Sequence, residues 1–240
     1  MDMTIATSMK IVDIHTHILP LVDDGAKSFD ESIAMIQKEI EQGVTTIILT
    51  PHVQSRVTKT TREEQVEIFM QLKKKVQELS LDVELILGAE IFYRSHLTPD
   101  YHTYTLGNSK CLLFEFSPMI ETPIEEITYN IKRQGFIPII AHAERYEYLT
   151  MIDYELIRRA GGILQVNTNA ILGLDSKSNK KLVIKMLKAG LIDIISTDTH
   201  NLDQRKPNMK ACIEELKNYV DDAYIQSLCG IKIEELLSIR

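Results

Sequence analysis

Tryptophan is absent from this chain of 240 residues, and cysteine occurs only three times, at Cys111, Cys212 and Cys229. An odd number of cysteines without a Cys-x-x-Cys pair provides neither a disulfide framework nor a thiolate zinc site. No arginine lies six positions after any of them. The sequence therefore lacks the Cys-x5-Arg loop of thiol-dependent phosphatases.

Long apolar runs are also missing. Runs such as 137–141 are far shorter than the ~18–20 residues that a membrane-spanning helix needs. The chain does not open with a basic segment followed by an apolar one, which is the pattern of a secretion signal. We therefore expect a cytoplasmic protein that does not insert into membranes.

Positive charge is in the minority, with 27 Lys and Arg against 34 Asp and Glu and a net charge of -7 at pH 7. This is the wrong sign for binding a nucleic-acid backbone. Hydrophobic residues make up 44% of the chain, and there are only 10 glycines and 7 prolines. Such a composition is typical of an ordinary globular protein and excludes a low-complexity one.

Short β-branched apolar runs alternate with stretches of helical periodicity, as in βα units around a parallel sheet. Strands are predicted at 10–15, 45–50, 83–88, 111–116, 137–141, 163–166 and 193–196. Helices are predicted at 28–41, 61–79, 123–135, 153–160, 178–189, 207–220 and 233–237. Capping-box patterns at Ser28 to Glu31 and at Thr61 to Glu64 mark the first two helix starts. We expect one domain over 9–240, with residues 1–8 as an N-terminal extension or a cloning remnant.

Seven such units can form either an open doubly wound sheet or a barrel. A nucleotide-binding open sheet would carry a glycine-rich turn after its first strand, but here no glycine occurs before Gly25. The predicted fold is therefore α/β, a distorted TIM-like (β/α)7 barrel. Its active site would draw on the C-terminal ends of many strands.

Metal-ligating residue types follow most of these strands. His15 and His17, two apart on an extended segment, project to the same side, and Asp198 and His200 repeat this spacing at the last strand. The sixth strand ends differently, in Asn167-Thr-Asn169. The candidate ligands at the strand ends are His15, His17, His52, Glu90, Glu115, His142, Asp198 and His200.

Each of these residues also has an ordinary structural interpretation. His52 could be a turn residue, and Glu90 and Glu115 could be ion-paired carboxylates. Burying so many imidazoles and carboxylates together without cations would, however, be costly. Mixed nitrogen and oxygen ligands suit Mn²⁺, Fe²⁺ or Zn²⁺. Two or three ions sharing these ligands would leave positions for water and substrate, the layout used to hydrolyse phosphate esters.

Guanidinium groups suit phosphate oxygens. Arg145 lies three residues after His142, and Arg205 lies five after His200. We interpret both as substrate-binding catalytic residues, although exposed surface arginines are the alternative. Arg56, four residues after His52, is a weaker substrate-binding candidate. His96 and His102 are interpreted as loop residues beside the mouth of the barrel.

With these residues assembled, the sequence resembles the PHP (polymerase and histidinol phosphatase) superfamily of metal-dependent phosphoesterases. Within it, the chain is most similar to the bacterial manganese-dependent protein-tyrosine phosphatases of capsule and exopolysaccharide loci. The segments that carry the resemblance are 13–20, 23–25, 50–52, 88–90, 113–116, 141–146, 165–167 and 196–200. Ala143 departs from the family, which often has proline there.

The resemblance implies a distorted seven-stranded barrel with a trinuclear metal centre. By position, one ion would be held by His15, His17, Glu90 and Asp198, a second by Glu90, Glu115 and His142, and the third by Asp24, His52 and His200. Asp24 comes from the resemblance alone, and its neighbour Asp23 is the alternative. The implied substrate is phosphotyrosine on the tail of a bacterial tyrosine kinase that regulates polysaccharide synthesis.

Other functions remain open at this point. Histidinol phosphatase or another small-molecule phosphoesterase could use the same scaffold. An exonuclease would need a polyanion-binding surface, against which the acidic composition argues. A non-catalytic, metal-stabilised interaction module would have no use for open coordination positions and paired arginines. The leading hypothesis is a protein-tyrosine phosphatase in which metal-activated hydroxide attacks phosphorus in line.

Overall fold

The computed structural model describes residues 10–97 and 99–240, so the expected extension at residues 1–8 lies outside them. All seven predicted strands are confirmed, with ends shifted by at most one residue. Two further short strands, β3 and β5, lie beyond the ends of β2 and β4. The strands are β1 (Ile11–Thr16), β2 (Val44–Leu49), β3 (His52–Val53), β4 (Glu84–Leu87), β5 (Glu90–Phe92), β6 (Cys111–Glu115), β7 (Ile137–Ile140), β8 (Ile163–Asn167) and β9 (Ile194–Ser196).

The strands form two sheets in which every pairing is parallel. One sheet has the order β1-β2-β4 and the other β3-β5-β6-β7-β8-β9. A bridge between Thr16 and Thr199 links β1 to the segment after β9. Among the described residues the ladder is thus not one continuous ring. One break follows β2 at Pro51, which has no N–H to donate to a ladder.

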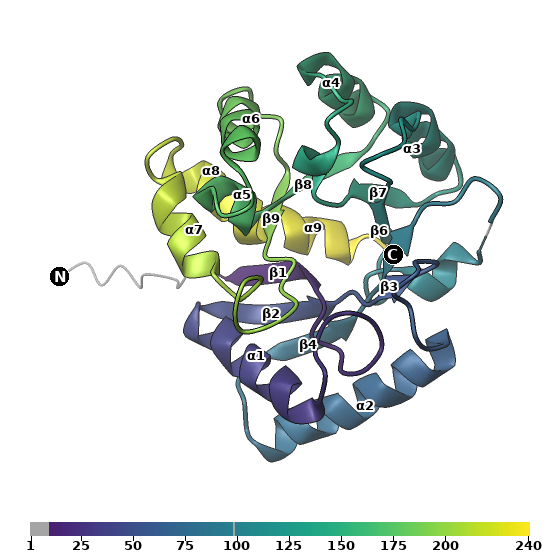
Figure 1. The fold of residues 1–240 in the computed structure, drawn as a ribbon, viewed down its shortest axis with the longest axis vertical. Helices are drawn as coiled ribbons and strands as arrows, with labels where there is room; N and C mark the ends of the chain where they lie inside the picture. The colour runs from purple at the N-terminus through teal and green to yellow at the C-terminus, as the bar shows by residue number, and fades with distance from the viewer. Residues whose placement is uncertain (1–9, 98) are drawn as a thin grey trace.

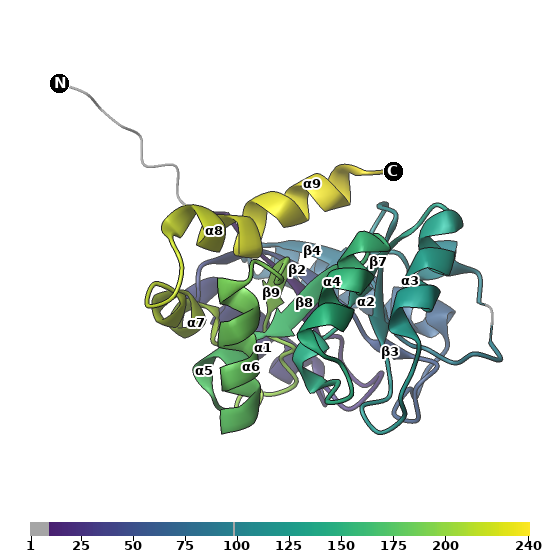
Figure 2. The ribbon, with the colours of Figure 1, turned by 90° about the horizontal axis from the view of Figure 1, so that it is seen from above.

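Helices lie outside the strands on most sides, as Figure 1 shows, and α9 lies across one end in the view of Figure 2. No helix in the described part of the chain has the length and apolar character needed to cross a membrane. The helices are α1 (Phe29–Glu41), α2 (Arg62–Glu78), α3 (Ile124–Arg133), α4 (Met151–Arg159), α5 (Thr168–Leu172), α6 (Lys177–Lys188), α7 (Met209–Leu216), α8 (Asp222–Gln226) and α9 (Lys232–Ser238).

The helix starts show which local predictions were correct. Thr61 and Glu64 form the full reciprocal capping box of α2. At α1 the prediction was half wrong, because Ser28 accepts from the Glu31 amide while the Glu31 carboxylate accepts from the amide of Lys27 instead. The predicted helix 207–220 was also wrong at its ends, since α7 covers only Met209–Leu216.

Two apolar clusters hold the fold together. The larger lies between strands and helices and includes Leu49 and Phe114. The smaller gathers alternate strand residues such as Val12 and Ile14, and Ile233 of α9 joins it. The strands are buried on both faces, which explains the nearly continuous apolar runs in the sequence. The two apolar clusters pack around the strands and so fix the positions of the strand ends.

Candidate functional site

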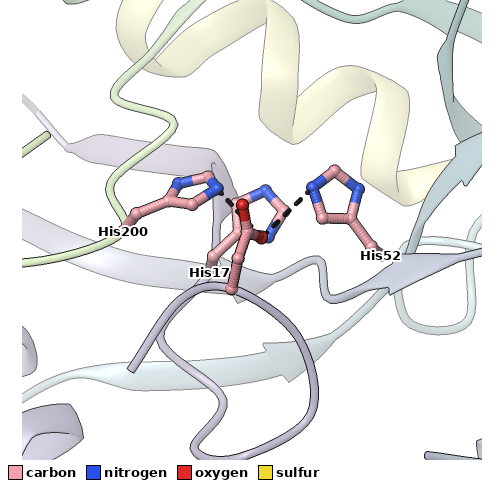
Figure 3. Close-up of side chains that lie close together, drawn as sticks. His17, His52 and His200 are labelled. Atoms are coloured by element: carbon pink, nitrogen blue, oxygen red, sulfur yellow. Dashed lines mark ion pairs between the residues drawn. The ribbon is translucent and has the colours of Figure 1, made fainter. Parts of the chain in front are cut away.

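The nine predicted metal ligands meet at the C-terminal ends of the strands. Most are buried, whereas the Glu115 side chain is 18% exposed and that of Asp24 is 45% exposed. Each contributes to a group of three or four residues whose ligand atoms lie within 4.8 Å of one another. Figure 3 shows three of the imidazoles, those of His17, His52 and His200, around one carboxylate.

Glu90 is the carboxylate that most imidazoles approach. Its Oε1 lies 3.3 Å from Nε2 of His15 and 3.0 Å from Nε2 of His142. Its Oε2 lies 3.2 Å from Nε2 of His17 and 3.0 Å from Nδ1 of His52. A carboxylate shared in this way is suited to bridge two cations.

One carboxylate oxygen of Asp198 lies near histidines, and the other lies near arginines. Its Oδ1 lies 3.4 Å from Nε2 of both His15 and His17. Its Oδ2 lies 3.0 Å from Nη2 of Arg145 and 2.6 Å from Nη2 of Arg205. The arginines predicted to bind phosphate therefore lie beside the ligand cluster and pair with one of its members.

Asp24 reaches the cluster from the loop after β1. Its Oδ1 lies 3.6 Å from Nε2 of His52 and 3.6 Å from Nε2 of His200, and these ion pairs are the dashed lines in Figure 3. The neighbouring Asp23 has a different position. Its Oδ2 lies 2.9 Å from Nδ1 of His17 and accepts from the amide of His52 at 3.0 Å. Asp23 thus orients the His17 ring through Nδ1, the nitrogen that points away from the cluster, whereas Asp24 faces the cluster.

Gly25 allows this loop to lie against β1. A Cβ atom at position 25 would be only 2.0 Å from the carbonyl oxygen of His17 and 2.6 Å from its Cβ. The same carbonyl accepts from the amide of Ala26 at 3.1 Å. Only glycine permits so close an approach, so the position of Asp24 depends on Gly25.

Two of the predicted ligands have left-handed backbone conformations, His142 with φ 33° and Asp198 with φ 53°. Such conformations are unfavourable for residues with a Cβ and concentrate at functional sites. Each is held by a hydrogen bond, from the His142 amide to Oε1 of Gln165 at 2.8 Å and from the Asp198 amide to the carbonyl of His15 at 2.9 Å.

Gln165 and Asn167 contact the predicted ligands, and the strand-end reasoning did not select them. Nε2 of Gln165 donates to Oδ1 of Asn167 at 2.9 Å, and Nδ2 of Asn167 donates to Oδ2 of Asp198 at 2.8 Å. At the end of β8, which carries no ionisable residue, this buried amide pair thus contacts a predicted ligand that follows β9. The Gln-x-Asn spacing, which belongs to the PHP resemblance, was the available signal.

Arg56 is not brought to the cluster. The cavity beside the ligands has a volume of about 240 Å³ and is lined by residues that include Glu115, Arg145 and Arg205, but Arg56 does not line it. Arg56 is exposed and lines a separate, larger groove together with His96. His102 lies on another surface of the protein.

The electrostatics of the cluster depend on burial and on close charges. Burial and the neighbouring Glu90 raise the pKa of Glu115 to about 7. Burial, reinforced by Arg145, lowers the pKa of His142 to about 4, and burial with His17 lowers that of His200 to about 4. These two imidazoles are therefore neutral at pH 7, the state in which histidine binds metals.

The donor set fits divalent cations. Several buried atoms have charged neighbours but make no hydrogen bond of acceptable geometry among the described residues, including Oε2 of Glu90, Nδ1 of His52 and Nε2 of His200. Buried polar atoms without partners are costly, and a bound cation would satisfy them. Imidazole and carboxylate ligands suit Mn²⁺, Fe²⁺ or Zn²⁺, and the buried cysteines Cys111, Cys212 and Cys229 contribute nothing here.

Comparison with proteins of known sequence gives a consistent result. The chain is 31% identical to tyrosine-protein phosphatase YwqE of Bacillus subtilis over 203 residues, which cover 81% of this chain and 79% of that protein. It is 34% identical to tyrosine-protein phosphatase CpsB of Streptococcus pneumoniae over 214 residues, which cover 83% and 87%.

Solved structures extend the comparison to the fold. A crystal structure from work on YwqE and CpsB, described as unique metal-dependent tyrosine phosphatases, matches with a TM-score of 0.83 and 28% identity, covering 95% of this chain and 94% of that one. A phosphotriesterase from Mycobacterium tuberculosis matches at 0.62 with 11% identity, covering 96% and 94%, which is a likeness of fold alone.

The model of the capsular polysaccharide synthesis family CpsB/CapC matches residues 11–238, nearly all of the described chain. The chain therefore belongs to the CpsB/CapC family of capsular polysaccharide synthesis proteins.

Proposed function

We propose that this protein is a metal-dependent protein-tyrosine phosphatase. The observation that carries the proposal is the convergence of nine imidazole and carboxylate ligands beside a cavity that two arginines also line. The relatives named as tyrosine-protein phosphatases, and the metal-dependent ones of known structure, support the same activity. Its phosphoprotein substrate is a tyrosine-phosphorylated bacterial kinase tail in capsule or exopolysaccharide synthesis.

We propose three ligand sets for two or three ions. His15, His17, Glu90 and Asp198 hold one, Glu90, Glu115 and His142 a second, and Asp24, His52 and His200 a third. The contacts of Glu90 with His15 and His142, of Asp198 with His17 and of Asp24 with His200 support these sets. His52 lies 3.0 Å from Glu90 and 3.7 Å from Glu115 as well, so it connects the third set to the second. Mn²⁺ is the proposed metal. Cations bound there act as Lewis acids and make a water molecule nucleophilic at neutral pH.

The chain itself positions the phosphate. Arg145 and Arg205 both approach Oδ2 of Asp198, and their side chains are 31% and 33% exposed. We propose that their forked guanidinium groups also contact the phosphate oxygens and stabilise the charge that develops there. Burial lowers the pKa of Arg145, but the carboxylates of Asp198 and Glu144 outweigh burial and raise it, so Arg145 stays charged.

The proposed architecture is one distorted (β/α)7 barrel in a single domain over residues 9–240. In this view β3 and β5 continue β2 and β4 past their breaks. Two backbone hydrogen bonds support closure between β1 and the end of β9, from His17 to the Thr199 carbonyl at 2.8 Å and from Asp198 to the His15 carbonyl at 2.9 Å.

The direct test is phosphate release from a phosphotyrosine peptide, measured with and without a chelator and after Mn²⁺ is restored. Histidinol phosphate is assayed under the same conditions. We expect chelator-sensitive hydrolysis of the peptide. Hydrolysis of histidinol phosphate alone would instead make the protein a small-molecule phosphoesterase, and no activity on either substrate with metal bound would favour an interaction module.

A matched pair of variants connects this activity to the cluster. His52→Ala removes a ligand that lies near both Glu90 and Asp24, so metal content and activity are both expected to fall. His102→Ala changes an exposed histidine on another surface and should alter neither. Full activity and metal content in His52→Ala would contradict the proposed site.

A further inference from the structure

A groove of about 860 Å³ lies next to the cavity beside the metal ligands. Ser55 and Phe92 line both spaces, so the two are adjacent. We call the larger space the flanking groove. It lies over the segments that follow β3, β5 and β6, which are neighbours in the sheet. In Figure 1, β3, β6 and α3 lie together on the right of the molecule.

The volumes of the two spaces suggest that each one binds a different part of the substrate. Pockets that enclose a whole drug-sized ligand measure roughly 300–1,000 Å³. The cavity at the ligands, about 240 Å³, is smaller than this and suits only the phosphate end of a substrate. A small phosphate ester would make no use of the much larger flanking groove, whereas an extended peptide that carries the phosphate would continue into it.

The flanking groove has exposed apolar side chains at its rim. Met119 is 89% exposed and Ile120 is 66% exposed, and both line the groove. The buried side chains of Phe116 and Ile127 line it as well. Exposed apolar groups that cluster beside a catalytic site are typical of a surface that binds another chain.

Charge differs along the groove. The segments after β3 and β5 contribute Arg56 and Arg94, and the segment after β6 and the start of α3 contribute Glu121 and Glu126. Arg94 is held in place, because its Nε donates to the carbonyl of Gln54 at 2.7 Å and its guanidinium lies 5.4 Å from the centre of the Phe92 ring. The basic end thus includes Phe92, one of the two residues that also line the cavity.

From these features we propose that the flanking groove binds the substrate peptide next to its phosphotyrosine. An apolar side chain of the peptide packs on Met119 and Ile120, and an acidic side chain pairs with Arg56. This inference rests on the proposed function and specifies its substrate as an extended, acidic peptide segment. It also gives a role to Arg56, which lies outside the ligand cluster.

The test compares a phosphotyrosine peptide that has acidic and apolar neighbours with free phosphotyrosine, using the intact metal-loaded protein. The measured quantity is the ratio of the two kcat/KM values. For wild type we expect the peptide to be preferred. Met119→Asp combined with Ile120→Asp should lower the ratio about tenfold, mainly through KM of the peptide, because truncating or reversing an interface anchor typically costs at least that much.

Two further variants complete the design. Ile152→Asp places the same charge on a residue of α4 that is 68% exposed and does not line the groove, so the ratio should stay at the wild-type value. Arg56→Glu should lower the ratio for the acidic peptide more than for the same peptide with neutral neighbours. Because all these residues are exposed, folding is not expected to change.

The outcomes separate this inference from the proposed function. Equal kcat/KM values for peptide and free phosphotyrosine in wild type, or unchanged ratios in both groove variants, would overturn the flanking groove as a subsite and leave the phosphatase activity standing. A wild-type protein that hydrolyses neither phosphotyrosine compound in the presence of Mn²⁺ would overturn both.

Discussion

Oε1 of Gln165 lies 3.1 Å from Nδ1 of His15 and accepts the backbone amide of His142 at 2.8 Å. One buried oxygen thus orients two proposed metal ligands. With Nδ1 of His15 as donor to Gln165, Nε2 remains free to bind a cation, and the left-handed backbone of His142 is held in place.

Replacing Gln165 should therefore impair the metal centre without removing a ligand. For Gln165→Ala we expect metal affinity or activity to fall about 10–100-fold, the usual effect of losing an outer hydrogen-bond partner. Metal titration and phosphatase assays would measure both. Gln37→Ala, at an exposed position of α1, is the matched control, and equal behaviour of the two variants would contradict a positioning role.

Replacing an arginine should lower activity without lowering metal content, unlike replacing a proposed metal ligand. Arg145→Ala and Arg205→Ala should each lower kcat/KM by about 10²–10³-fold, as the loss of a group that stabilises transition-state charge does. Metal content should be retained, since neither arginine is a ligand. Arg159→Ala is the control, because the Arg159 side chain is 76% exposed on α4. Loss of metal from the Arg145 variant would show that its pairing with Asp198 is mainly structural.

Gly25→Ala should disrupt the loop that carries Asp24. The new methyl group would meet the backbone of His17, so either the loop or β1 must move. We expect a lower Tm and weaker metal binding together. Gly190→Ala provides the comparison, since Gly190 has φ +65° but nothing lies within 4 Å of an added Cβ. That variant should show only the backbone cost of about 1–2 kcal/mol, with metal binding unchanged.

Metal binding should strengthen as pH rises from 6 to 8. The pKa of Glu115 is raised to about 7 by burial and by Glu90, so the metal-free site carries a proton there at pH 6 that binding must displace. His142 and His200, with pKa values lowered to about 4, are already neutral and add no dependence in this range. Burial lowers the pKa values of His15, His17 and His52, but neighbouring carboxylates outweigh burial and raise them, so these imidazoles release protons as well. Apparent affinity should rise about tenfold per pH unit for each proton released.

Calorimetry in buffers of different ionisation enthalpy would count the protons. Glu115→Gln should make the pH dependence of metal affinity shallower, because the amide has no titrating proton for the metal to displace. The uncharged amide should also weaken metal binding at pH 8. An unchanged slope in this variant would contradict the assignment of the titration to Glu115.

Much of the fold was predictable because its signals are local. Apolar runs that are buried on both faces gave the seven main strands, and the capping box at Thr61 gave the start of α2. The division into two sheets was not predictable from periodicity. A short strand such as β3, which holds only His52 and Val53, is too short to produce a pattern, and it forms because β5 lies beside it.

The sequence by itself determined which residue types follow each strand, and parallel strands necessarily bring those ends to one edge. The tertiary structure decided what each side chain contacts. Asp23 and Asp24 are chemically identical, but the amides of Gly25 and His52 hold Asp23 against Nδ1 of His17, while Asp24 lies near His52 and His200.

The same division explains the residues whose surroundings could not be predicted from the sequence. Gln165 and Asn167 carry no charge, so they stand out only once their amides are seen against His15 and Asp198. Arg56 follows His52 by four residues but lines the flanking groove. Residue type and strand order are properties of the chain, whereas the direction of a side chain depends on turns and on packing between distant segments.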